Sequence, residues 1–189
     1  MLGRLTLCQL SYSRIGSDGS RADARLPRMD RSEHETFMRQ AIDLARQRAI
    51  TEQVSSPFSC LVVRDGVVIG SGVNAVIANN DPTAHGEVVA IRDACTSLGT
   101  HDLTGATLYT SSEPCPMCYA AAWWARIEAI YYASTIDDAM KFGDFDDRPI
   151  YDAIALPGPD RAVPARELLR DEMLEVWRAF RAIPDRIHY

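Results

Sequence analysis

Apolar residues recur along this chain with a spacing that changes from that of a helix to that of a strand. From Ser32, where an S-x-x-E pattern with Glu35 predicts a capping box, apolar residues follow at helical spacing. Residues 33–50 are therefore predicted to form an amphipathic helix. Residues 58–64 and 67–76 are rich in β-branched residues and flank an Asp-Gly pair, which predicts a β-hairpin.

Helical and extended patterns then alternate through the middle of the chain. Helical spacing predicts a helix over residues 84–98, ended by Gly99, and another over residues 115–126. Runs rich in β-branched and aromatic residues predict strands over residues 106–111 and 128–133. A strand–helix–strand unit forms a parallel pair through a right-handed crossover and places its helix on a sheet face. The chain is therefore predicted to be an α/β protein.

The C-terminal quarter combines loops with two short predicted elements. An aspartate-rich loop is predicted over residues 137–147, and a proline-rich loop follows it. A short strand near residues 161–169 and a helix near residues 170–182 come next. Pro184 ends that helix, because proline cannot continue it, and residues 183–189 are left as a C-terminal tail.

The composition is that of an ordinary globular domain. The chain has 189 residues, of which 47% are hydrophobic and 24% are charged, so it can bury one sizeable core. No apolar run approaches the roughly 20 residues that a membrane-spanning helix needs, and no membrane partner is expected. The formal charge of −6 argues against a nucleic acid partner, because such proteins usually show a basic surface. A small-molecule substrate is therefore favoured.

The first residues differ from the rest of the chain. Residues 1–28 contain five arginines and two aspartates, so they carry a charge of +3 and residues 29–189 carry −9. We expect either a disordered N-terminal extension or a start site placed too early, with Met29 as the true start. A family-specific interaction arm is the alternative. Residues 29–189 are predicted to form the functional domain.

The cysteines point to a metal site. Their number, five, is odd, which suits a reducing compartment such as the cytoplasm better than a disulfide framework. Cys115 and Cys118 lie one turn apart at a helix start, which places both sulfur atoms on one side and favours thiolates. His85, at another helix start, supplies a third ligand. Since no fourth Cys or His pairs with them, the pattern is typical of a catalytic zinc with one open position.

Glu87 lies two residues after His85 and can serve the same site without binding the metal. A carboxylate beside an activated water can take its proton and return protons to a substrate nitrogen and a leaving amine. The combination of H-x-E with P-C-x-x-C is the signature of zinc nucleobase deaminases. A redox Cys-x-x-Cys pair and a closed structural zinc site are the alternatives. Cys60 and Cys95 are predicted to be buried hydrophobic residues.

These motifs and several segments around them resemble the cytidine deaminase superfamily, and within it the bacterial guanine deaminases and plant guanosine deaminases. The resemblance runs from about residue 34 to the last residue. It rests on His34-Glu35-Thr36-Phe37, Pro57-Phe58, Asn74, Asn80-Asp81-Pro82-Thr83-Ala84-His85, Glu113 to Cys118, Trp124-Ala125-Arg126, Phe145-Asp146-Asp147 and Tyr189. The resemblance implies a three-layer α-β-α fold, with a mixed sheet of about five strands between helices. It also implies one zinc ion per chain at the helix starts.

The resemblance further implies roles for individual residues. Asn74 is expected to hydrogen-bond a purine, and Asp147 to contact its amino group or relay protons. Phe58 and Trp124 are expected to border the base, whereas Trp123 faces another side of its helix and is expected in the core. The other expected substrate-binding residues are Ala84, Glu113 and Tyr189. The C-terminal tail is expected to close the site, commonly from the partner chain of a homodimer with exchanged C-terminal segments.

The chain also departs from the pattern that it resembles. A segment that is usually Gly-Gly-Pro-Phe-Gly has serine at positions 55, 56 and 59, and Gly86 stands where alanine is usual. Ser112 replaces a cysteine, and Asp144 is inserted before Phe145. A residue other than glycine adds a Cβ and a hydroxyl near the expected pocket floor. These changes leave the zinc chemistry intact and bear on the identity of the substrate.

The sequence as a whole predicts a zinc-dependent hydrolase that deaminates an aminated purine, with guanine converted to xanthine and ammonia. Guanosine or another aminated heterocycle, such as another nucleoside, a triazine or cytosine, is an alternative substrate. A tRNA adenosine deaminase shares the zinc signature, but the acidic balance and the closing tail disfavour it. A non-enzymatic, zinc-stabilised interaction module is the alternative outside enzymes, and it predicts a closed metal site.

Overall fold

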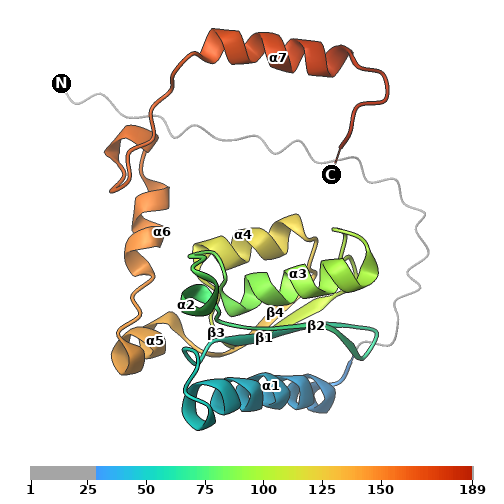
Figure 1. The fold of residues 1–189 in the computed structure, drawn as a ribbon, viewed down its shortest axis with the longest axis vertical. Coiled ribbons are helices and arrows are strands. Elements are labelled where there is room, and N and C mark those ends of the chain that lie inside the picture. Colours follow the sequence, from blue (N-terminus) through green and yellow to red (C-terminus); the bar gives the residue numbers. More distant parts are fainter. Residues whose placement is uncertain (1–28, 189) are drawn as a thin grey trace, which may run out of the picture.

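The computed structural model describes residues 29–188, which surround one sheet with helices (Figure 1). The sheet has the strand order β2-β1-β3-β4. Its strands are β1 (Ser59–Arg64), β2 (Val67–Val73), β3 (Thr107–Ser112) and β4 (Ala129–Ser134). Strand β1 runs antiparallel to β2 and β3, whereas β3 and β4 are parallel. The sheet is therefore mixed, as the resemblance implied.

Helices cover both faces of the sheet. Helix α1 (Arg31–Arg46) lies on one face, and α3 (Gly86–Leu98) and α4 (Pro116–Trp124) lie on the other (Figure 1). Side chains of neighbouring residues in β3 point to opposite faces of the sheet, because side chains alternate along a strand. Tyr109 packs with residues of α1, whereas Leu108 packs in the cluster beneath α3 and α4. The predicted three-layer α-β-α fold is confirmed.

The start of the first helix differs from the prediction. Asp30 is the N-cap, because its carboxylate accepts a hydrogen bond from the Glu33 backbone N–H at 3.0 Å. The Glu33 carboxylate accepts one from the Asp30 N–H at 2.7 Å, which completes a capping box. Ser32 donates its hydroxyl to Asp30, and Glu35 forms exposed ion pairs with arginines. The predicted Ser32 box is therefore wrong by two residues. The helix continues into the π-helical turn η1 (Gln47–Thr51).

The predicted aspartate-rich loop over residues 137–147 is mostly helical. Helix α5 (Ile136–Gly143) and helix α6 (Arg148–Ala155) occupy this segment and the residues after it. Thr135 caps α5 in a capping box with Asp138. Aspartate is common both in loops and in the first turn of a helix. The sequence pattern alone therefore could not distinguish these helix starts from a loop.

The predicted strand over residues 161–169 is also wrong. The short turn η2 (Gly158–Asp160) leads into an irregular segment that reaches α7 (Arg170–Ala182). Pro164 lacks a backbone N–H, and an isolated strand has no neighbour to pair with. The part of the chain that the structure describes therefore has four strands, not about five. One further element, the short helix α2 (Val76–Asn79), lies between β2 and α3.

The molecule divides into a packed part and an extended part. We call residues 30–134 the core domain and residues 135–188 the C-terminal arm. No residue of α5, α6 or α7 is buried, and α7 lies away from the helical layers (Figure 1). One stripe of α7 is nevertheless apolar: Met173, Val176, Trp177 and Phe180. Between residues 29 and 188, no helix is long and apolar enough to cross a membrane.

Candidate active site

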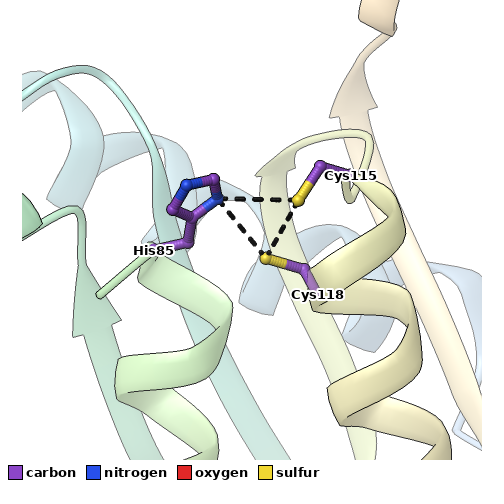
Figure 2. A group of neighbouring side chains, drawn as sticks. All are labelled: His85, Cys115 and Cys118. Carbon is purple, nitrogen blue, oxygen red and sulfur yellow. Dashed lines mark hydrogen bonds between the residues drawn. The ribbon is translucent and has the colours of Figure 1, made fainter. Parts of the chain in front are cut away.

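Two helix starts meet at one end of the sheet and bring three ligand-type side chains together. His85 is the N-cap of α3, Cys115 is the N-cap of α4, and Cys118 lies within the first turn of α4. Figure 2 shows the three side chains pointing toward one another from the two helices. The structure thus joins the three residues that the sequence singled out as metal ligands, although 30 residues separate His85 from Cys115.

The three donor atoms form a nearly equilateral triangle, which we call the ligand triangle. The Sγ atoms of Cys115 and Cys118 lie 3.6 Å apart, and each lies 3.6 Å from Nδ1 of His85. A tetrahedral zinc with Zn–S bonds of about 2.3 Å and a Zn–N bond of about 2.0 Å needs ligand separations of roughly 3.5–3.8 Å. Thiolate and imidazole are also ligand types that zinc prefers. The ligand triangle therefore fits one zinc ion per chain.

The electrostatics of the triangle favour a thiolate at Cys115. Hydrogen bonding to Cys118 and then to His85 holds the pKa of the Cys115 thiol well below its usual range. The contact with Cys115 in turn raises the pKa of His85. Both sulfur atoms belong to buried residues, which keeps them from oxidants and competing ligands. A thiolate is the form of cysteine that binds zinc.

The triangle leaves room for a fourth ligand that residues 29–188 do not supply. Among residues 29–188, these three are the His, Cys or acidic side chains whose ligand atoms all lie within 4.8 Å of one another. Structural zinc sites are almost always closed by four protein ligands, whereas catalytic ones keep a position for water or substrate. The described part of the chain therefore has the donor set of a catalytic site.

Glu87 lies in the first turn of α3, buried beside the triangle and only 5% exposed. Its Oε2 accepts a hydrogen bond from Sγ of Cys118 at 3.3 Å. Its Oε1 accepts one from the hydroxyl of Thr110 on β3 at 3.2 Å. Burial raises the pKa of Glu87. A carboxyl group with a raised pKa can take up and release a proton near neutral pH, which is what an acid–base catalyst must do.

Three predicted substrate-binding residues lie close together in the loops beside the metal site. The backbone N–H of Asn74 donates to the carbonyl of Phe58 at 2.8 Å. The N–H of Ala75 donates to the carbonyl of Ala84, also at 2.8 Å, and Ala84 directly precedes His85. Phe58 and Asn74 are half-buried, whereas Ala84 is fully buried. Backbone hydrogen bonds therefore join the segments that carry these residues to the first metal ligand.

The C-terminal arm reaches the site through the connection between α5 and α6. The ring of Phe145 packs edge-on against Phe58, with centroids 4.9 Å apart. Asp147 is half-buried, and its pKa is raised by burial and then by the negative charge of Cys115. The Tyr151 hydroxyl donates to the carbonyl of the residue before Cys115 at 3.0 Å. Asp147 is therefore within electrostatic reach of the ligand triangle.

The remaining expected residues have different surroundings. The Glu113 carboxylate accepts a hydrogen bond from the Ile136 backbone N–H at 3.2 Å, so it joins the metal-binding loop to α5. Trp124 is 63% exposed on α4. Trp123 is equally exposed, so its predicted place in the core is wrong, because only a narrow stripe of α4 faces the sheet. Tyr189 and the expected N-terminal extension (residues 1–28) lie outside the described residues.

The departures from the resembled pattern have a structural reason at two positions. A Cβ on Gly86 would lie 3.0 Å from the carbonyl oxygen of Phe58 and 3.2 Å from Cα of Ser59. The start of α3 thus lies directly on the backbone before β1. The hydroxyl of Ser59 donates to the carbonyl of Ala41 in α1 at 2.6 Å. It therefore faces α1, and not the pocket floor where an added hydroxyl was expected.

Two residues with contacts at the site were not singled out as site residues from the sequence. The Thr110 hydroxyl donates a hydrogen bond to a carboxylate oxygen of Glu87. The Tyr151 hydroxyl of α6 donates one to the metal-binding loop. Strand alternation could have pointed to Thr110, because it shares its face of β3 with the core residue Leu108. No spacing signal could have pointed to Tyr151, since its contact depends on how the arm folds back.

Comparisons with known proteins agree with this geometry. Residues 31–134 match the family model of the cytidine and deoxycytidylate deaminase zinc-binding region. Guanine deaminase of Bacillus subtilis is 42% identical over 156 residues, which are 82% of this chain and 99% of the relative. Its X-ray structure matches with a TM-score of 0.78 and covers 85% of this chain and 99% of that chain. The tRNA-specific adenosine deaminase of Agrobacterium fabrum is 42% identical over 103 residues, 54% of this chain and 66% of the relative.

These matches differ in how much of the chain they cover. The family model ends with β4, at the boundary between the core domain and the arm. The match to guanine deaminase is longer than the whole stretch that precedes the arm, so it includes part of the arm. The match to the family model covers both helix starts and every residue of the ligand triangle. The chain belongs to the family of zinc-binding cytidine and deoxycytidylate deaminases.

Proposed function

We propose that this chain catalyses the hydrolytic deamination of guanine to xanthine, with release of ammonia. One observation carries the proposal. The ligand triangle has the acid–base residue Glu87 buried beside it, in a chain whose similarity to guanine deaminase continues from the core domain into the arm. The shared core domain supports a zinc-dependent deaminase, and the longer match supports guanine over the substrates of more distant relatives.

The chain's own residues supply the proton transfers of this reaction. When bound by the ligand triangle, zinc lowers the pKa of a water molecule toward neutrality. Glu87 takes a proton from the attacking water at Oε2, the oxygen beside Cys118, and passes it to the ring nitrogen next to the aminated carbon. It then carries the second water proton to the amino group. A carbon–oxygen bond forms, the carbon–nitrogen bond breaks, and ammonia leaves.

The remaining residues would bind and orient the base. Asn74 would hydrogen-bond the purine, and Asp147 would contact the amino group or relay protons to it. Phe58, which already packs against Phe145, would flank one side of the ring. The other proposed contacts with the base or the pocket wall are Ala84, Glu113, Trp124 and Tyr189.

We further propose that the enzyme is a cytoplasmic homodimer with exchanged C-terminal arms. Met173, Val176 and Trp177 of the apolar stripe of α7 and Trp123 of α4 are between 47% and 63% exposed. Apolar faces of this kind on one chain would be covered by their counterparts on a second copy. The tail of one copy would then close the site of the other. The free cysteines suit a reducing compartment.

A substrate panel tests the proposed function. The full chain, with its zinc content measured, is incubated with guanine, guanosine, cytosine, an aminotriazine and a tRNA that carries the target adenosine. We expect ammonia from guanine at the highest kcat/KM, with xanthine as the product. Faster release from another compound would replace guanine as the substrate. Zinc-loaded protein that releases ammonia from no compound would support the interaction module instead.

A tRNA adenosine deaminase is the second candidate, because such an enzyme shares 42% identity with this chain over 103 residues. The formal charge of −6 disfavours it, since a tRNA stem-loop needs a basic rim. Salt-dependent tRNA binding together with inosine formation would favour this candidate over guanine deamination.

A further inference from the structure

Strand β3, one of the two inner strands of the sheet, lies beneath the carboxylate of Glu87. Thr110 of β3 pairs with Cys60 of β1 on one side and with Tyr132 of β4 on the other. It is 1% exposed, and strand alternation turns its side chain toward the face that carries α3 and α4. Because backbone pairing fixes it on both sides, Thr110 is a rigid point directly under Glu87.

Glu87 by itself has no fixed orientation for its two carboxylate oxygens. The terminal torsion of a glutamate is broad and roughly two-fold, so rotamer preference does not decide which oxygen faces the metal site. Contacts must decide it. Cys118 donates to Oε2 at 3.3 Å, and Thr110 donates to Oε1 at 3.2 Å.

The chemistry of threonine suits this task. Branching at Cβ makes its χ1 stiff, so the hydroxyl is held in one direction. A buried carboxylate also needs hydrogen-bond donors, and a hydrogen bond to a charged group is stronger than one between neutral groups. Serine could keep the donor with less stiffness, whereas valine would keep the shape and lose the donor.

We propose that Thr110 is a positioning residue for this deaminase: its hydroxyl holds Oε1 of Glu87 so that Oε2 faces the ligand triangle. This inference rests on the proposed deaminase function and adds a residue to its acid–base machinery. The Thr110 hydroxyl donates to Glu87, so Thr110 would act through that residue. A carboxylate that turns by about 1 Å loses its alignment with the attacking water, which can slow a reaction about 100-fold.

Three variants of the full chain test this role on whichever panel substrate the parent deaminates. We expect Thr110→Val to lower kcat about 10- to 100-fold, with KM changed less than about 3-fold and one zinc per chain retained. Thr110→Ser should recover most of the rate. Thr107→Val is the matched control, because it lies on the same strand but on the face toward α1, and it should keep the parent kcat. If Thr110→Val folds poorly, Thr110→Ala replaces it.

Coupling to the catalytic residue separates positioning from general loss of structure. In a Glu87→Gln background, Thr110→Val should cause little further loss of kcat, because there is no carboxylate left to position. Full additivity of the two losses would overturn the proposal. So would a parent-like kcat in Thr110→Val, whatever the preferred substrate.

A measurement without turnover keeps this inference distinct from the proposed function. Crystal structures of the zinc-loaded parent and of Thr110→Val show the orientation of Glu87 directly. We expect Oε2 to face the metal site in the parent and in Thr110→Ser, and the carboxylate to turn in Thr110→Val. An unmoved Glu87 in Thr110→Val would overturn the proposal even if guanine were the wrong substrate.

Discussion

The core domain and the C-terminal arm bury their apolar residues very differently. In the core domain, Val62, Leu108 and Tyr109 are fully enclosed between the sheet and its helices. In the arm, no side chain of residues 135–188 is buried, and Trp177 of α7 is 57% exposed. The core domain thus has its own hydrophobic core, whereas the apolar side chains described in the arm remain partly or largely exposed.

The two regions also divide the expected chemistry. The core domain carries the ligand triangle and Glu87, and the family model ends where the core domain ends. The arm carries Asp147 and leads to Tyr189, and the match to guanine deaminase extends into it. We propose from this difference that hydrolytic deamination belongs to the shared core domain, and that the arm contributes to the choice and enclosure of the substrate. The predictions below test that division.

The largest effect is expected from the acid–base residue of the core domain. Glu87→Gln should lower kcat about 10²- to 10⁴-fold, because the amide cannot accept the proton of the attacking water. Zinc binding should persist, since Glu87 is outside the ligand triangle. Steady-state kinetics together with metal analysis checks this. Metal-replete Glu87→Gln with a near-parent rate would contradict the proposed mechanism.

The next effect concerns stability and compares one leucine from each region. Leu108→Ala should lower the free energy of unfolding by about 2–5 kcal/mol, because it leaves a cavity in a fully buried position. Leu168→Ala in the arm, where the side chain is 85% exposed, should change it by less than about 0.5 kcal/mol. Urea unfolding measures both. Equal losses would show that the arm is packed in solution.

A smaller effect is expected from the apolar stripe of α7. Trp177→Glu should weaken homodimer formation about 10- to 100-fold, because it places a charge on a face that we expect the second copy to cover. Arg178→Glu, on the opposite side of α7, is the matched control and should leave the dimer intact. Sedimentation velocity over a range of concentrations measures both. A Trp177→Glu dimer of unchanged affinity would exclude this face as the interface.

The smallest effect is expected at a departure from the resembled pattern. Ser59→Ala should lower the free energy of unfolding by about 1 kcal/mol, because it removes a buried hydrogen bond to Ala41. It should leave kcat and KM unchanged, since the hydroxyl faces α1. Unfolding and kinetics on the same preparation check this. A changed substrate preference would place Ser59 in the pocket after all.

Prediction from the sequence succeeded where local pattern and packing agree. The strands and helices of the core domain follow hydrophobic periodicity, and the ligand triangle follows from two motifs at helix starts. Prediction failed where one signal has two structural meanings. The aspartates near Asp138 suit both a loop and a helix cap, and Pro164 interrupts a β-rich run that has no neighbouring strand. Trp123 shows that a large apolar residue on a helix of the core domain can be exposed and not buried.

The close approach of Gly86 to the backbone of Phe58 has a consequence for redesign of the substrate pocket. A Cβ on Gly86 would lie 3.0 Å from the carbonyl oxygen of Phe58, so the backbone of Phe58 packs tightly against the segment that begins with His85. Moving the backbone of Phe58 toward α3 would therefore press on the segment that carries the metal ligand His85. We therefore expect changes of substrate range to be easier to obtain in the arm, around Phe145 and Asp147, which are less buried than Gly86.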